Sequence, residues 1–415
     1  MKTLLVIGYV WPEPKSSAAG SRMLQLIECF QQGGYEVEYA SPAAPSEHAI
    51  NYQNYGIRTA EIQLNHSSFD EYVSKLNPQV VMFDRFMMEE QFGWRVEKHC
   101  PQALRILDSE DLHCLRFARQ ALAKHNQDVI QQVPVKDLFS DHARREIASI
   151  YRCDLTLTIS QYEMQLLQEV FHVPENLLLY TPFMLKDVSA NRDLGFSQRQ
   201  HFVSIGNFRH EPNWDAVLQL KQQIWPLIRK QLPQAQLHIY GAYPPKKATQ
   251  LHNEKQGFHV KGWCDDAFAV LKQARLLLAP LRFGAGLKGK LLDAAQCGLP
   301  AVTTSIGAEG LYTSENQTTA CISDDFTQFA NMAVKLYEQE SDWQALQARC
   351  DTFLQTGFAW QTFSRNLIER VHQITTQLDN HRLNNFTGSM LRHHTMKSTQ
   401  YMAQWIEAKN KLSDS

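Results

Sequence analysis

The sequence lacks the features that mark several classes of protein. No apolar run reaches the ~20 residues that a membrane-spanning helix needs. The eight cysteines are scattered without a C-x-x-C pair, which argues against a disulfide framework or a cysteine zinc site. The formal net charge of −2 offers no basis for binding nucleic acid. We therefore expect a reduced globular protein in the cytoplasm, with the inner face of the membrane as an alternative location.

Several catalytic motifs are also missing. The chain contains no H-E-x-x-H and no Asp-x-Asp, so no metal site is predicted and a metal-independent reaction is favoured. It has no G-x-x-x-x-G-K-[ST] phosphate loop, which disfavours a nucleotide hydrolase. No G-x-G-x-x-G opens the chain, which disfavours a dehydrogenase. The sequence predicts no cofactor.

Short apolar runs alternate with amphipathic helical patterns along the chain. Runs that are apolar on both faces and separated by helices indicate parallel sheets covered on both sides. A polar segment at 184–200 separates two such halves. The sequence predicts an α/β protein with two doubly wound, Rossmann-like domains that face a central cleft. The expected strands are 3–10, 35–41, 57–64, 79–84, 103–108, 154–160, 201–208, 236–242, 258–263, 275–283, 300–305 and 318–323.

The stretch LRFGAGLKGKLLDAAQCG carries an unusual set of side chains at a strand-to-helix turn. Gly284 and Gly286 follow the strand, where the backbone must turn sharply or approach a ligand closely. Lys288 and Lys290 add two cations to a helix N-terminus, which itself attracts anions. Asp293, a turn further on, suits a hydroxyl-rich partner. A diphosphate with a sugar attached fits this set, and a tight turn with solvated lysines is the alternative.

This segment, GAGLKGKLLDAAQCGLPAVTTSIGAEGL, resembles the donor site of glycosyltransferase family 4, the glycosyl transferases group 1. The fold of that family is the two-Rossmann architecture called GT-B. Supporting likenesses are IGNF, GWCDD, the Ser160–Glu163 turn and FAWQTFSRNLIERV, which resembles a last helix that crosses back to the first domain. The resemblance implies an acceptor domain at 1–187, a donor domain at 188–360, a crossing helix at 361–380 and a helical tail at 381–415.

The resemblance assigns roles around the donor diphosphate. Lys288 would stabilise the leaving phosphate as a catalytic residue, and Asp293 would hold the ribose hydroxyls. Four residues would lend backbone N–H groups to the diphosphate: Gly284, Ala285, Gly286 and Leu287.

A second group would surround the diphosphate from other loops. Gly206, with the catalytic candidate Arg209 beyond it, would flank it, and Gly20 would let the first domain close on the phosphates. A basic pair usual in the family partly falls on Asn207, which leaves Arg209 and Lys290 as substitutes.

The sugar side of the site departs from the family pattern. Of two glutamates usual eight positions apart, the second corresponds to Asp293 and the first falls on Ala285. A dedicated sugar pocket would therefore have to come from elsewhere, with Glu309 a further donor-binding candidate.

Acidic residues at two strand ends are the candidates for the acceptor side. Asp84 ends one strand, and Asp108, Glu110, Asp111 and His113 follow another. They would bind the acceptor or transfer a proton, and a helix N-terminus capped by acids is the alternative.

The predicted function is transfer of a sugar from a nucleotide diphosphate sugar to a glycan, lipid or protein hydroxyl, with retention of configuration implied by the resemblance. The alternatives are a catalytically reduced GT-B scaffold that binds a nucleotide sugar or glycan, and a sugar-nucleotide epimerase. In the tail, Met390, His394, Met402 and Trp405 predict one apolar helical stripe. It would pack on the protein itself, with a homodimer contact or a shallow membrane contact as alternatives.

Overall fold

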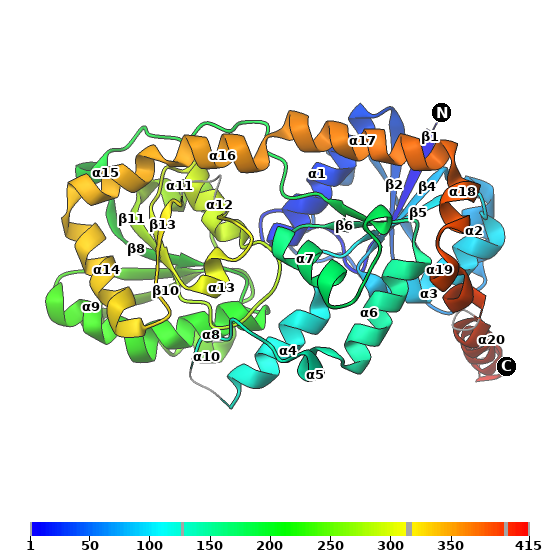
Figure 1. The fold of residues 1–415 in the computed structure, drawn as a ribbon. Helices are drawn as coiled ribbons and strands as arrows, with labels where there is room; N and C mark the ends of the chain where they lie inside the picture. The colour runs from blue at the N-terminus through cyan, green and yellow to red at the C-terminus, as the bar shows by residue number, and fades with distance from the viewer. Residues whose placement is uncertain (1, 126–127, 313–317, 394–396, 414–415) are drawn as a thin grey trace.

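The first half of the chain forms a seven-stranded parallel sheet (Figure 1). The computed structural model describes residues 2–125, 128–312, 318–393 and 397–413. The strand order is β3-β2-β1-β4-β5-β6-β7. The strands are β1 (Lys2–Ile7), β2 (Tyr35–Ser41), β3 (Ile57–Glu61), β4 (Val80–Asp84), β5 (Leu104–Asp108), β6 (Leu155–Thr158) and β7 (Leu178–Tyr180).

The second half forms a six-stranded parallel sheet in the order β10-β9-β8-β11-β12-β13. The strands are β8 (Gln200–Ile205), β9 (Leu237–Tyr240), β10 (Phe258–Gly262), β11 (Ala274–Ala279), β12 (Ala301–Thr303) and β13 (Ala320–Ile322). Both sheets reverse their order beside their first strand, the switch point at which doubly wound sheets bind ligands. The two-sheet α/β architecture predicted from the sequence is confirmed.

Helices cover both faces of each sheet. The first domain contains α1 (Ala18–Gln32), α2 (Ser68–Leu76), α3 (Phe86–His99), α4 (His113–Ala123), α5 (Val135–Leu138), α6 (Asp141–Arg152) and α7 (Gln161–Glu169). The second contains α8 (Glu211–Gln219), α9 (Trp225–Gln231), α10 (Lys246–Thr249), α11 (Ala267–Gln273), α12 (Gly289–Gln296), α13 (Ser305–Ala308), α14 (Phe326–Glu338), α15 (Glu340–Ala348) and α16 (Cys350–Phe358).

Alternation along the strands divides each core into two layers. In β1, Leu5 and Ile7 pack on one face of the sheet and Leu4 and Val6 on the other, and all four are fully buried. Successive side chains of a strand point to opposite faces, so a strand that is buried on both sides must be apolar throughout. This is why the apolar runs predicted the strands.

Two chain segments cross between the domains side by side. The N–H of Leu185 donates to the carbonyl of Phe358 at 2.7 Å, and the N–H of Trp360 donates to the carbonyl of Leu185 at 2.9 Å. Beyond this point α17 (Trp360–Thr376) returns to the first domain, where Trp360 and Val371 join the core. Figure 1 shows α16 and α17 in line along one side of the molecule.

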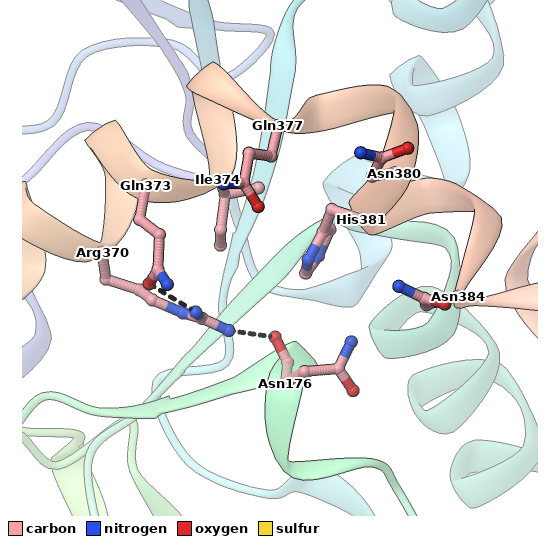
Figure 2. Close-up of a pocket in the computed structure, with 8 residues that line it drawn as sticks. All are labelled: Asn176, Arg370, Gln373, Ile374, Gln377, Asn380, His381 and Asn384. Carbon is pink, nitrogen blue, oxygen red and sulfur yellow. Dashed lines mark hydrogen bonds between the residues drawn. The ribbon is translucent and has the colours of Figure 1, made fainter.

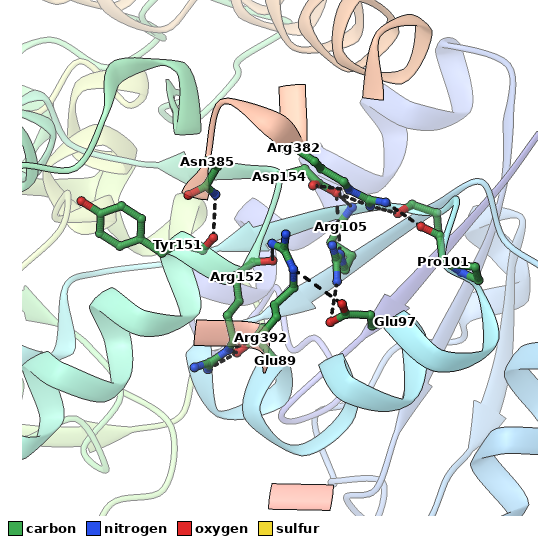
Figure 3. A network of polar contacts seen from close by, with 11 residues as sticks. Glu89, Glu97, Pro101, Arg105, Tyr151, Arg152, Asp154, Arg382, Asn385 and Arg392 are labelled. Atoms are coloured by element: carbon green, nitrogen blue, oxygen red, sulfur yellow. Dashed lines mark hydrogen bonds and ion pairs between the residues drawn. The ribbon is translucent and has the colours of Figure 1, made fainter. Parts of the chain in front are cut away.

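The tail continues over the first domain as α18 (Leu378–Leu383), α19 (Phe386–Leu391) and α20 (Lys397–Ser413). A buried ion-pair network anchors it (Figure 3). Arg382 donates two hydrogen bonds of 2.8 Å to Asp154, which is 2% exposed, and one of 2.6 Å to the carbonyl of Pro101. These contacts thus fix the tail at a specific position on the first domain.

The structure also corrects some expected elements. The short strand β7 was not predicted, because three residues carry too weak a pattern. The predicted continuous tail helix is divided into α19 and α20, and His394 lies outside the described residues. Met390, Met402 and Trp405 of the predicted stripe are exposed rather than packed on the protein. No helix in the described ranges is long and apolar enough to cross a membrane.

A small cavity, of about 170 Å³, lies between α17, α18 and the segment that precedes β7 (Figure 2). Asn176 lines it from just before β7, so it opens at the amino ends of the strands, away from the switch point. Arg370 crosses its floor and donates to Gln373 Oε1 and the carbonyl of Asn176, both at 2.8 Å. Its position excludes it from the site that the sequence predicts.

Replacing the anchor of the tail should destabilise the first domain. In an Arg382→Met variant the buried Asp154 carboxylate loses two charge-assisted bonds, although Arg105 still contacts it. We expect a loss of about 2–3 kcal/mol in the free energy of unfolding, measured by urea denaturation with tryptophan fluorescence. Arg144→Met, which removes an exposed ion pair, is the control and should change stability by less than about 0.5 kcal/mol. Equal midpoints for the two variants would contradict the anchoring role.

Candidate active site

A cavity of about 1220 Å³ lies between the two domains. Its walls come from loops that follow the carboxyl ends of β1, β4, β5, β8 and β11, so the ligand-binding edges of both sheets face one space. The walls hold most of the residues predicted from the sequence: Gly20, Asp84, Asp111, His113, Gly206, Asn207, Arg209, Gly284, Ala285, Gly286, Leu287, Lys288, Lys290 and Asp293. Asp108 and Glu309 do not line it.

The turn between β11 and α12 needs its two glycines. Gly284 has a φ of 152° and Gly286 a φ of 65°, which L side chains rarely adopt. A Cβ on Gly286 would also lie 2.9 Å from Cβ of Asp111 in the first domain. The turn therefore brings the backbone of one domain against the other.

Burial shifts the charged groups at the start of α12. Lys288 is only 8% exposed, and its Nζ donates to the carbonyl of Gly286 at 2.8 Å. Burial lowers the pKa of Lys288, although nearby Glu309 opposes the shift. Lys290 donates to Asn213 Oδ1 at 2.8 Å, and burial lowers its pKa to about 8. The structure places Lys288 in the wall of the cavity, where it is largely buried.

Asp293 lies one turn into α12 and faces the same space. Burial raises its pKa to about 7, and the charge of Lys290 only partly offsets the effect. Within the described ranges no residue donates a hydrogen bond to its carboxylate. A buried carboxyl group in this state gains most from a ligand that brings hydroxyl donors.

Glu163 binds one of the backbone groups that had been assigned to the diphosphate. Its Oε1 accepts the N–H of Gly286 at 2.8 Å and that of Leu112 at 2.9 Å. Burial, reinforced by Asp111, raises the pKa of Glu163 to about 8. In this arrangement, therefore, the predicted diphosphate contact from Gly286 is not available.

Arg119 holds the same turn from α4. Its guanidinium is fully buried, donates to the carbonyl of Gly284 at 2.8 Å and forms two bonds of 2.7 Å to the carboxylate of Glu309. Glu309 thus makes an ion pair between the domains and does not reach the cavity. Nothing in the spacing of Arg119 predicted this role, because the two partners are 190 positions apart.

The domains also meet at the other side of the cavity. Tyr243 donates to Glu13 at 2.9 Å, and the ring of His48 stacks on Trp263 at 3.9 Å between centroids. Arg209 lies over the ring of Tyr243 at 3.5 Å. Gly20 packs so closely on the backbone of Glu13 that a Cβ would come within 2.5 Å of it. The cavity is therefore bounded on two sides by contacts between domains.

The predicted acceptor residues have different surroundings. Asp111 pairs with Arg116 at 2.7 Å, and Arg116 with His113 holds the pKa of Asp111 below its usual range despite burial. Burial lowers the pKa of His113 to about 4. Asp108 is fully buried and bonded to Arg22 at 2.9 Å, so it acts in the core. In the described part of the chain no cluster of three or more acids, histidines or cysteines could hold a metal.

Comparison with known proteins identifies the second domain. Residues 199–339 match the family model described as Glycosyl transferases group 1. Over these residues, the second domain matches the group 1 glycosyltransferases. The resemblance predicted from the β11–α12 turn is thereby confirmed, and the turn lies inside the matched region. No curated protein matches the chain.

Solved structures show the fold of the whole chain. The Anabaena protein HepE, in complex with UDP and glucose, has a TM-score of 0.66 at 10% identity, covering 89% of this chain and 99% of its own. Sucrose-phosphate synthase from Thermosynechococcus elongatus has a TM-score of 0.64 at 16% identity, covering 91% and 100%. WaaG, a glycosyltransferase of lipopolysaccharide biosynthesis, has a TM-score of 0.60 at 11% identity, covering 89% and 99%. The chain therefore has the GT-B fold, and residues 199–339 of its second domain match the group 1 family model.

Loss of Arg119 should open the two domains. An Arg119→Met variant removes the ion pair to Glu309 and the bond to Gly284, and it leaves a largely buried carboxylate without its partner. We expect closure to weaken by about 2–5 kcal/mol, with a larger radius of gyration in small-angle X-ray scattering. Arg145→Met, whose ion pair with Glu90 lies within the first domain, is the matched control and should scatter like the wild type. If both variants have the wild-type radius, Arg119 does not hold the domains together.

Proposed function

We propose that this protein is a glycosyltransferase that takes a sugar from a nucleotide diphosphate sugar and transfers it to a hydroxyl group of an acceptor. One observation carries the proposal. The N-terminus of α12, the buried Lys288, the half-buried Lys290 and the carboxyl group of Asp293 line one cavity between the domains, in the segment that matches the group 1 family. The titles of HepE structures name UDP and UDP-glucose, which makes these the first ligands to try.

The chemistry follows from where charge develops. When the bond between sugar and diphosphate breaks, negative charge grows on the leaving phosphate. Lys288, Lys290 and the positive end of α12 would stabilise that charge, and they act strongly because the site is buried. Arg209, lying over Tyr243 at the opposite wall, would add a cation from the loop after β8. Contacts between the domains would exclude water from the reacting sugar.

We further propose that the reaction is metal-independent and retains configuration. The two lysines and the helix N-terminus supply the positive charge that a metal ion would otherwise bring, and the described walls lack a metal-binding cluster. A protein nucleophile is unnecessary if the leaving phosphate accepts the proton of the attacking hydroxyl. Retention rests on the family resemblance.

A binding protein without turnover is the second candidate. Two observations favour it: Ala285 replaces a glutamate usual in the family, and Glu163 occupies the N–H of Gly286. Such a protein would bind UDP but would release no sugar from UDP-glucose. An epimerase on the same scaffold would convert the nucleotide sugar without any acceptor. Product analysis with and without acceptors separates the three activities.

The first test of the proposal concerns Lys288. A Lys288→Met variant keeps most of the side-chain volume and removes the charge beside the leaving phosphate. We expect the turnover number to fall by about 10²-fold or more, because loss of one preorganised charge stabiliser has that effect. The melting temperature should not fall, since the wild-type ammonium group is desolvated. Turnover within a few-fold of the wild type would refute the assignment.

Asp293 allows a second test through nucleotide affinity. The carboxylate would accept the ribose hydroxyls in bonds worth about 1.5–3 kcal/mol, so Asp293→Asn should weaken UDP by that amount in calorimetry. Because its pKa is raised to about 7, the carboxylate forms as pH rises from 6 to 7.5, and wild-type affinity for UDP should increase more than that of the variant. The variant also serves as the control for titration of UDP itself. EDTA should change neither affinity, and a strong effect of EDTA would contradict the metal-free scheme.

A further inference from the structure

Two adjacent strands of the first sheet end in carboxylates that have different surroundings. Asp84 and Asp108 are the last residues of β4 and β5 and lie opposite one another in the ladder. Asp108 receives two hydrogen bonds from Arg22, of 2.9 and 3.2 Å, and is sealed in the core. Asp84 is 4% exposed but lines the cavity, and its contact with Arg85 is 3.6 Å long. Within the described ranges each acid has one buried carboxylate oxygen without a hydrogen-bond partner, but Asp108 is paired with Arg22 in the core, whereas Asp84 lies at the cavity.

The carboxyl group of Asp84 has capacity left for a ligand. Oδ2 accepts one long bond of 3.3 Å from the N–H of Tyr9. Oδ1 is buried and has no hydrogen-bond partner within the described ranges. A buried polar atom without a partner is destabilising, so a donor arriving from the cavity would be bound favourably.

Glu110 is a second carboxyl group on the same wall. It is 9% exposed, lines the cavity, and receives no hydrogen bond from any described residue. Burial, together with the charges of Asp108 and Asp84, raises its pKa to about 8, so the side chain is mainly neutral at pH 7. A neutral carboxyl group can donate one hydrogen bond and accept another.

Arg85 adds a positive charge next to Asp84. Its side chain lines the cavity, and its guanidinium lies 5.6 Å from the ring centre of the exposed Tyr9. Arg85 and Glu110 both have left-handed backbones, with φ of 72° and 61°. Such conformations are strained for residues other than glycine and persist where the surrounding structure enforces them.

The chemistry of this wall selects among ligands. Arg85 disfavours a simple cation, and Asp84 disfavours an anion. Vicinal hydroxyls fit, because each both donates and accepts a hydrogen bond, and the ring of Tyr9 offers an apolar face for a pyranose. A single lipid or serine hydroxyl would leave most of these groups unsatisfied.

We propose that Asp84, Arg85 and Glu110 form the acceptor subsite, and that they bind neighbouring hydroxyls of a sugar ring. The acceptor of this enzyme is therefore a glycan. The inference rests on the proposed glycosyltransferase function. It keeps Asp84 and Glu110 from the acceptor residues expected from the sequence, joins Arg85 to them and removes Asp108.

The decisive experiment measures acceptor binding and transfer separately from donor binding. Methyl glycosides of common hexoses and heptoses, dodecanol and a serine peptide are offered to the full chain with UDP-glucose, and saturation-transfer NMR is recorded in the presence of UDP. We expect at least one glycoside to bind and to accept glucose, while dodecanol and the peptide do not. Binding of no glycoside, or transfer only to dodecanol or the peptide, would overturn the inference.

Variants then locate the subsite. Asp84→Asn and Glu110→Gly should each weaken the bound glycoside by about tenfold or more, with UDP affinity in calorimetry within about twofold of the wild type. Glycine suits the left-handed backbone at 110, so the melting temperature of Glu110→Gly should equal or exceed that of the wild type. Asp141→Asn, an exposed acid outside the cavity, is the control and should change neither measurement. Unchanged glycoside affinity in both cavity variants would show that the wall is only structural.

The pH dependence gives a signature that a structural role would not produce. The charged groups around Glu110 are Asp84, Arg85, Asp108 and Arg22, with Tyr39 behind them. Wild-type affinity for the glycoside should fall as pH rises through 8, because Glu110 then ionises beside two acids. Glu110→Gln keeps a donor and an acceptor, so it should retain binding and lose this dependence.

The outcome also separates this inference from the proposed function. If UDP-glucose neither binds nor reacts with the wild type, the proposed function fails. If UDP-glucose is turned over but glycoside binding is unchanged in the variants at Asp84 and Glu110, the proposed function stands and the acceptor subsite is wrong.

Discussion

The guanidinium of Arg119 is the constraint on which the site depends. It reaches from the first domain into the second, where it binds both the carboxylate of Glu309 and the carbonyl of Gly284. A fully buried charge is costly without acceptors around it, and Nε of Arg119 already has no partner in the described ranges, so the acceptors of its two terminal nitrogens must stay in place for the domains to remain closed. The shape of the β11–α12 turn and the closure of the cavity are thus parts of one arrangement.

Burial gives the cavity its chemical character. It lowers the pKa of Lys288 and Lys290 and raises that of Asp293 and Glu110. The charged form of each group is therefore disfavoured in the cavity, and a charged, hydroxylated ligand would stabilise it. Acidic and basic side chains with shifted pKa values in one cavity are typical of sites that bind and react with ligands. The wall from the second domain is rich in lysine and the wall from the first domain in carboxyl groups, and this division supports the proposed transfer between two substrates.

Glu163 changes the comparison with the group 1 family. The family pattern predicted four backbone N–H groups for a diphosphate, yet one of them bonds to a carboxylate from α7. An anion bound at this turn must either use the remaining groups or displace Glu163. Ala285, where the family has a glutamate, packs against the core of the first domain. The departure from the pattern is therefore accompanied by a contact between domains.

The sequence by itself determined the two sheets and the donor turn. Apolar runs such as 79–84 and 103–108 had to be buried strands, because only a covered parallel sheet satisfies them. The glycines and lysines of the turn carried their chemistry in adjacent positions, so local spacing was enough. The sequence did not predict β7, because that strand is only three residues long. It did not predict the division of the tail into α19 and α20 either, because the apolar pattern there is weak.

Only the tertiary structure decided which polar residues meet. Arg119 and Glu309, Glu163 and Gly286, or Arg22 and Asp108 lie far apart in the chain, and no local pattern encodes such pairs. Asp84 and Asp108 look alike in the sequence, since each is an acid at the end of an apolar strand. Arg22 on α1 reaches one and not the other, and this single contact places Asp108 in the core and leaves Asp84 facing the cavity. Burial and pairing are properties of the folded neighbourhood, and the sequence could predict only the candidates among which the fold would choose.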